Sequence, residues 1–164
     1  MSPKKIGFGG GCHWCTEAVF QALRGVMWVE QGFIQSTPPN QSWSEAVIVT
    51  YDTEVIDLET LANVHVRTHA ATAAHSMRPK YRSAIYTFSE HQQDEANIIL
   101  DGLGDEFDNG LVTEALPFVG FKPSEERLLN YYETNPARPF CKRYIDPKLD
   151  LIRKNFSSQA LAGI

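Results

Sequence analysis

The stretch FGGGCHWCTEAVF, residues 8–20, joins a predicted strand to a predicted helix. Residues 5–8 have the pattern of a short strand, and the three glycines at 9–11 allow a tight turn after it. From Cys12 onward, apolar residues recur at helical spacing, which predicts a helix with one buried stripe that ends near Gly25. A cysteine therefore stands where a strand turns into a helix, and a second cysteine follows three residues later.

Outward from this stretch, strand patterns and helix patterns roughly alternate along the chain. Strand patterns cover residues 26–34, 46–52, 83–88 and 112–118. Helix patterns cover residues 58–69, 90–103, 123–133 and 146–156. This alternation predicts an α/β chain in which helices cover a sheet. We find no internal repeat and no long linker, so we expect a single domain over 1–164, with a frayed tail over 157–164.

The composition is that of an ordinary globular protein. At 164 residues, the chain is long enough to bury a core without disulfide support. Its 43% hydrophobic and 21% charged residues exclude the disordered and collagen-like classes. A net charge of −5 argues against a nucleic-acid binder, whose affinity would depend on a basic face.

The same sequence predicts a protein of a reducing compartment. No run approaches the roughly 20 apolar residues that span a bilayer, and the first residues show no apolar signal segment. Three cysteines, an odd number, fit a reduced state better than a disulfide scaffold. We therefore expect a cytoplasmic protein that contacts neither membranes nor nucleic acids.

Cys12 and Cys15 allow three interpretations. At a helix start, the free N–H groups and the helix dipole stabilise a thiolate, so Cys12 is favoured as a redox-active or nucleophilic thiol with Cys15 one turn away. A zinc site is a second possibility, with His65 and His69 as further ligands at i, i+4 spacing, although one CxxC pair is weak evidence for zinc. Two small buried residues in a helix start are the third.

Four segments of the chain resemble motifs of one enzyme family. GGGCHWCTEAVFQALRGV and SEAVIVTYDTEVIDLETL are similar to the GCFWCTE and HAEVVQVTYDP motifs of the A-type peptide methionine sulfoxide reductases (MsrA). HAATAAHSMRPKYRSAIY and NPARPFCKRYIDPKLDLIRKNF resemble the family's TQYRSAIY segment and its NP..PYC ending. The matches cover nearly the whole chain in order. The resemblance implies a two-layer α+β fold with a mixed, largely antiparallel sheet, a ferredoxin-like core and flanking helices.

The resemblance also implies an activity and a set of site residues. The family reduces the S-epimer of methionine sulfoxide, in proteins or free, with thiols. By position, Cys12 matches the family's nucleophile, Glu45 the acid that protonates the sulfoxide oxygen, and Tyr81 a tyrosine that hydrogen-bonds this oxygen. Trp14 matches the wall that receives the substrate's methyl group. Cys141 lies in the C-terminal segment where many members keep a recycling thiol.

The implied reaction needs no metal and no other cofactor. Attack by the Cys12 thiolate leaves a sulfenic acid, and a second thiol, Cys15 or Cys141, condenses with it to form a disulfide. A thioredoxin or a similar dithiol then reduces this disulfide. The family also implies a monomer.

Several positions depart from the family pattern. His13 replaces the phenylalanine beside the nucleophile, which makes one wall of the methyl pocket polar and titratable. The loop IQSTPPNQSW is shortened and lacks the family's second oxygen-binding tyrosine, and Ser76 replaces an acidic residue. The alternative is therefore a catalytically altered redox-sensing or binding module that uses the Cys12–Cys15 pair.

Overall fold

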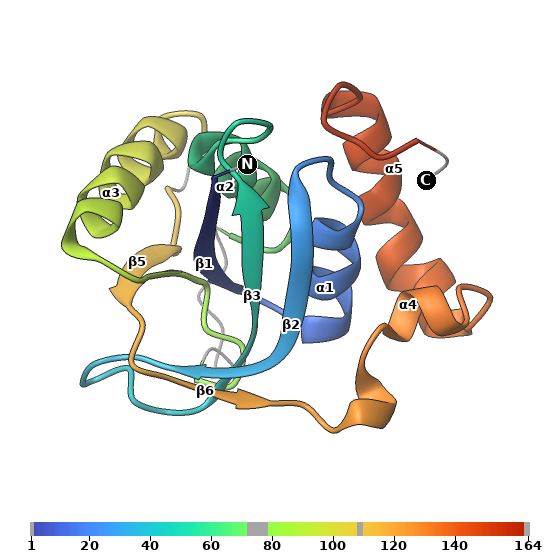
Figure 1. Ribbon diagram of the computed structural model, residues 1–164, viewed down its shortest axis with the longest axis horizontal. Coiled ribbons are helices and arrows are strands. Elements are labelled where there is room, and N and C mark those ends of the chain that lie inside the picture. The colour runs from blue at the N-terminus through green and yellow to red at the C-terminus, as the bar shows by residue number, and fades with distance from the viewer. Residues whose placement is uncertain (1, 72–78, 108–109, 163–164) are drawn as a thin grey trace.

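The fold is a single six-stranded sheet with helices packed against it, as seen in a computed structural model that describes residues 2–71, 79–107 and 110–162 (Figure 1). The strands are β1 (Pro3–Gly9), β2 (Val26–Gln35), β3 (Ser44–Asp52), β4 (Ala84–Thr87), β5 (Glu114–Pro117) and β6 (Gly120–Pro123). Their order across the sheet is β5-β4-β1-β3-β2-β6. Only β4 and β5 pair in parallel, so the expected mixed, largely antiparallel sheet is confirmed.

Four helices of nine or more residues cover one face of the sheet. They are α1 (His13–Gln21), α2 (Leu58–Thr68), α3 (Glu90–Gly104) and α5 (Asp146–Asn155). In Figure 1, α1 and α2 lie behind the central strands, α3 lies on the β5 side, and α5 runs beside α1. All four contribute to the main hydrophobic core, together with alternate residues of β1 and β3. Phe8 of β1, for example, stacks on Phe20 of α1 with ring centroids 4.4 Å apart.

The opposite face of the sheet carries a smaller apolar cluster. Its buried members are Ile34, Ala46, Ile48, Ala84 and Tyr86, and they alternate with the residues that face the helices. Beside this cluster Arg82 is buried, where it donates hydrogen bonds to the Tyr86 hydroxyl at 3.1 Å and to the Ile34 carbonyl at 3.2 Å. Buried side chains therefore pack on both faces of the sheet, including at the ends of β1, β2 and β3 nearest the start of α1.

The predicted helix over 123–133 is wrong. In its place β6 ends at Pro123, a 3₁₀ turn covers Glu126–Leu128, and a single helical turn, α4, covers Tyr131–Thr134. Asn130 has a left-handed backbone with φ of 53°. The Glu17 carboxylate of α1 accepts hydrogen bonds from the backbone N–H groups of Asn130 and Tyr131, both at 3.1 Å. This long-range clamp overrides the local helical pattern.

The C-terminal segment is docked where fraying was expected. Through residue 162, it packs against the end of α1: the Arg24 amide donates to the Gln159 carbonyl at 2.7 Å, and the Leu161 amide donates to the Ala22 carbonyl at 2.8 Å. Ala160 also forms a bridge with Leu23. These backbone hydrogen bonds, which sequence periodicity cannot reveal, order the tail.

Gly10 is required by the turn that precedes Cys12. Its φ is +153°, and an added Cβ would lie 2.5 Å from the His69 ring, which is itself held by hydrogen bonds to the His65 carbonyl and the Ser83 hydroxyl. We expect Gly10→Ala to lower the free energy of unfolding by about 1–3 kcal/mol. At Gly11 an added Cβ meets no heavy atom within 4 Å. Gly11→Ala should therefore leave stability unchanged or raise it by up to about 1 kcal/mol. Urea denaturation of the two variants tests this, and equal stabilities would contradict it.

Candidate active site

Cys12 caps the N-terminus of α1, as the sequence predicts. Its backbone is extended, and its carbonyl accepts the first helical hydrogen bonds, from the amides of Cys15 at 3.1 Å and Thr16 at 3.3 Å. The side chain is partly exposed, whereas Cys15, on the next turn, is buried. Cys12, the candidate nucleophile, is therefore partly exposed to solvent and lies at the positive end of a helix dipole.

The two thiols form an unequal pair. The Cys15 thiol donates a hydrogen bond to the Cys12 sulfur, and with the backbone N–H groups of Trp14 and Cys15 it lowers the pKa of Cys12. Burial and the negative charge of Glu45 oppose this shift without reversing it. The same hydrogen bond and burial raise the pKa of Cys15 far above its usual range. Cys12 is therefore the thiol of the pair that ionises more readily, and Cys15 the one that stays protonated.

Glu45 is held beside the start of α1 by its place near the beginning of β3. The side chain is buried, and its Oε1 accepts a hydrogen bond from the His13 amide at 3.2 Å. The Lys80 ammonium lies 3.8 Å from the other carboxylate oxygen. Because the charge of Glu45 acts on Cys12, an acid and a nucleophile share this site.

His13, the residue expected at one wall of the methyl pocket, packs against β2 and β3. The ring is buried with 6% exposure, and its edge meets the Phe33 ring at 5.3 Å between centroids. Nδ1 donates to the Gly32 carbonyl at 3.0 Å, and Nε2 lies 3.4 Å from Oε1 of Glu45. His13 is thus in direct contact with the predicted acid.

Trp14 lies among aromatic side chains of the C-terminal part of the chain. Its ring stacks on Tyr131 with centroids 4.1 Å apart and an angle of 4° between planes. Phe140 meets it edge-on at 5.5 Å. One face of the indole is therefore covered by Tyr131, and the structure places an aromatic wall beside the Cys12 turn.

Tyr81 is linked to the site by Lys80, the preceding residue, which contacts both Tyr81 and Glu45. Lys80 lies over the Tyr81 ring, 5.1 Å from its centroid, and the hydrogen bond between the two side chains together with the charge of Glu45 raises the pKa of Lys80. The Lys80 carbonyl also accepts a hydrogen bond from the Glu45 amide at 2.8 Å. The segment that carries Tyr81 is therefore anchored to the start of β3. Ser76, which departs from the family pattern, lies outside the described residues.

Cys141 lies in a turn of π-helix, Cys141–Ile145, directly before α5. Its side chain has 0% exposure, its Sγ lies 3.7 Å from the Asn135 carbonyl, and burial raises the pKa of the thiol. Cys141 belongs to the same hydrophobic core cluster as Cys15, and its charge contributes to the raised pKa of Cys15. Of the two candidate resolving thiols, Cys15 is the one hydrogen-bonded to Cys12.

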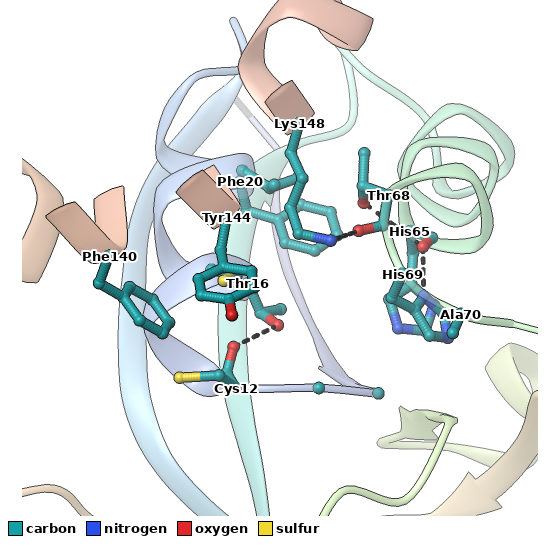
Figure 2. A pocket seen from close by; sticks show the side chains of 14 residues that line it. Cys12, Thr16, Phe20, His65, Thr68, His69, Ala70, Phe140, Tyr144 and Lys148 are labelled. Carbon is teal, nitrogen blue, oxygen red and sulfur yellow. Dashed lines mark hydrogen bonds between the residues drawn. The ribbon is translucent and has the colours of Figure 1, made fainter. Parts of the chain in front are cut away.

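A cavity of about 360 Å³ opens beside Cys12 between α1, α2 and α5. Figure 2 shows Phe140 and Tyr144 on one side and the two histidines of α2 on the other. Lys148 points into it, and its ammonium donates to the Thr68 carbonyl. Burial lowers the pKa of Lys148.

The histidines of the zinc hypothesis have other partners. His65 Nε2 lies 2.7 Å from the Gly9 carbonyl, and His69 Nε2 lies 2.7 Å from the Ser83 hydroxyl. Within the described ranges, no three His, Cys, Asp or Glu side chains gather as ligands for a metal ion. Both histidines tie α2 to neighbouring backbone and side chains.

Comparison with known proteins agrees with this geometry. The sequence pattern of the family "Peptide methionine sulfoxide reductase" matches residues 4–160. The chain belongs to this family. The MsrA of Deinococcus radiodurans is 34% identical over 93% of this chain and 82% of its own length, and that of Trichodesmium erythraeum is 33% identical over 96% and 98%. Among solved structures, Mxr1 of Saccharomyces cerevisiae in complex with Trx2 shares the fold, with a TM-score of 0.64 and 23% identity over 77% of this chain and 84% of that one.

Some functional groups of this family member escaped sequence reasoning. Lys80 stands directly before Tyr81 in a matched segment, and Lys148 lies within the matched ending, yet neither was singled out. Adjacency to a matched tyrosine was a usable signal for Lys80. For Lys148, spacing against the buried Leu149 and Ile152 gave none, because only the packing of α5 turns the lysine inward. In the described part of the chain, no helix has the length and apolar character needed to cross a membrane.

Proposed function

We propose that this reductase acts on methionine S-sulfoxide, peptide-bound or free, with Cys12 as nucleophile and Glu45 as acid. One observation carries the proposal. The residue whose thiol pKa is lowered occupies the N-cap position of α1, accepts a hydrogen bond from a second thiol, and lies within electrostatic reach of a buried carboxyl group. Tyr81 is proposed to bind the sulfoxide oxygen. Trp14 is proposed to form a wall of the pocket that holds the methyl group.

The proposed reaction transfers one oxygen atom and two electrons. The Glu45 site gives a proton to the sulfoxide oxygen, which makes that oxygen able to leave sulfur. The Cys12 thiolate takes up the oxygen as a sulfenic acid, and the substrate sulfur, reduced by two electrons, leaves as methionine. The Cys15 thiol then attacks the Cys12 sulfur, so that an S–S bond forms, the S–O bond breaks and water leaves.

We propose Cys15 as the resolving thiol because it already contacts Cys12. Cys141, buried beside Cys15, is the candidate for a later exchange with the Cys12–Cys15 disulfide. Thioredoxin is the proposed reductant, since the related fold of Mxr1 is found in complex with Trx2. The partly exposed Cys12 is the sulfur that such a partner can reach. We propose the cytoplasm as the compartment, because three free cysteines fit a reducing environment.

A single-turnover experiment tests the function. Fully reduced protein without any recycling thiol is mixed separately with peptides that carry the S- or the R-epimer of methionine sulfoxide. One methionine per chain from the S-epimer alone, with two thiols lost, is the expected result. Oxidation of the thiols by peroxide without methionine release from either epimer would instead support the redox-sensing alternative.

Two variants of Cys15 separate its two proposed roles. Cys15→Ala removes both the hydrogen-bond donor and the resolving sulfur, whereas Cys15→Ser keeps a donor. We expect both to release one methionine per chain but to lose one thiol in place of two, with a sulfenic acid left on Cys12. The pH at which iodoacetamide alkylates Cys12 should rise in Cys15→Ala and stay near the wild-type value in Cys15→Ser. Two thiols lost in either variant would assign resolution to Cys141.

A further inference from the structure

His13 and Glu45 form a buried pair in which the imidazole ring and the carboxylate are in direct contact. A carbonyl oxygen only accepts hydrogen bonds, so Nδ1 of His13, 3.0 Å from the Gly32 carbonyl, carries a hydrogen. Nε2 then faces Oε1 of Glu45 at 3.4 Å. With the bare lone pair of Nε2 turned toward an ionised carboxylate, the contact would be repulsive.

One additional proton removes this repulsion in either of two arrangements. It can reside on Nε2, giving an imidazolium beside a carboxylate, or on Glu45, giving a carboxylic acid that donates to a neutral imidazole. Hydrogen bonds between catalytic groups are often long before substrate binds and shorten afterwards, so 3.4 Å allows the transfer. Either arrangement would give the pair one proton that can be transferred to a substrate.

The charged groups around the pair come from three elements. At α1, Cys12 and Glu17 both interact electrostatically with it: the charge of Glu45 opposes the lowering of the pKa of Cys12, and the charge of His13 opposes the rise that burial causes in the pKa of Glu17. From the segment before β4, the Lys80 ammonium lies 3.8 Å from Oε2 of Glu45. The β2 side contributes the Gly32 carbonyl and the Phe33 ring, which are uncharged.

We propose that His13 is a positioning residue that keeps a proton on the Glu45 site at neutral pH and replaces it after each turnover. The inference rests on the proposed function of Glu45 as acid. In the reductive step, Glu45 gives its proton to the sulfoxide oxygen, and the pair is left as a carboxylate with a neutral imidazole. Cys12 supplies the electrons, and solvent returns the proton to the pair after methionine leaves.

The reason for such a pair lies in the ordinary acidity of its members. An isolated glutamic acid has lost nearly all of its protons by pH 7, whereas an imidazole exchanges its proton close to that pH. If Glu45 shares a proton with the His13 imidazole, the pair can supply a proton at a pH where an isolated glutamic acid has lost its own.

The test compares wild type with His13→Phe and His13→Asn in single-turnover methionine release between pH 5 and pH 9. Asn keeps a donor for the Gly32 carbonyl but binds no extra proton, so it controls for the structural role of the ring. Rates are divided by the iodoacetamide alkylation rate of Cys12, which removes the effect of its thiolate fraction. We expect both variants to be slower by about 10- to 100-fold at pH 7.5 and to approach wild type as the pH falls toward 5.

A second readout does not depend on turnover. The ring-proton NMR signal of His13 should titrate at higher pH in wild type than in Glu45→Gln, because the carboxylate stabilises the imidazolium. An unchanged titration would overturn the pair itself. Wild-type pH profiles in both His13 variants would overturn the inference while leaving the proposed function intact. No methionine from the wild-type protein would overturn the proposed function, and the acid role of the pair with it.

Discussion

Replacement of Cys12 by serine is expected to end methionine release in a single turnover. The reaction needs a thiolate that can accept oxygen, and the structure lowers the pKa of one thiol, that of Cys12. A serine hydroxyl is not ionised at this position near neutral pH and does not form a sulfenic acid. The other described thiols cannot substitute, because burial raises the pKa values of Cys15 and Cys141.

The fold of this variant should be preserved, which makes its loss of activity interpretable. Serine is among the best residues for the N-cap of a helix, and Cys12 occupies the N-cap of α1. Circular dichroism and urea denaturation serve as controls, and alkylation should count one thiol fewer than in wild type. Methionine release at the wild-type rate would contradict the assignment and move the nucleophile to another cysteine.

The parts of the site that follow from sequence are those that depend on local structure. Glycines, an N-cap position and CxxC spacing act within one turn of chain, so the strand, the turn and the thiol pair at Cys12 could be predicted. The strand after Tyr81, Ala84–Thr87, and the helix of residues 58–68 are likewise set by short-range periodicity.

The features of the site and fold that could not be predicted from sequence depend on contacts between distant segments of the chain. His13 reads as a polar helix-start residue until β2 and β3 supply the Gly32 carbonyl and Glu45 as its partners. The residues of 123–133 have a helical pattern, yet the Glu17 carboxylate of α1 holds Asn130 in a left-handed turn. Cys141 is a similar case, since its thiol is buried only when the turn Cys141–Ile145 packs into the core that also contains Cys15. Each case joins residues whose proximity no local pattern encodes.

Substitution of Glu45 by glutamine is expected to slow methionine release by about 10²- to 10⁴-fold, the range for loss of a general acid. Glutamine keeps the size of the side chain and an oxygen that can still accept the His13 amide, so the local fold should remain. It cannot carry the proton that the sulfoxide oxygen needs. The measurement is the rate of methionine release from the S-epimer near pH 7.

The same substitution should change the nucleophile in the opposite direction. The negative charge of Glu45 raises the pKa of Cys12, so an uncharged glutamine lets that pKa fall, and alkylation of Cys12 should be as fast as in wild type or faster. Glu59→Gln, an exposed acid in the first turn of α2, is the matched control and should change neither rate. A slower alkylation would mean that Glu45 supports the thiolate, and unchanged methionine release would mean that the proton comes from elsewhere. Slow turnover with a fully reactive thiol is the result that only the loss of an acid explains.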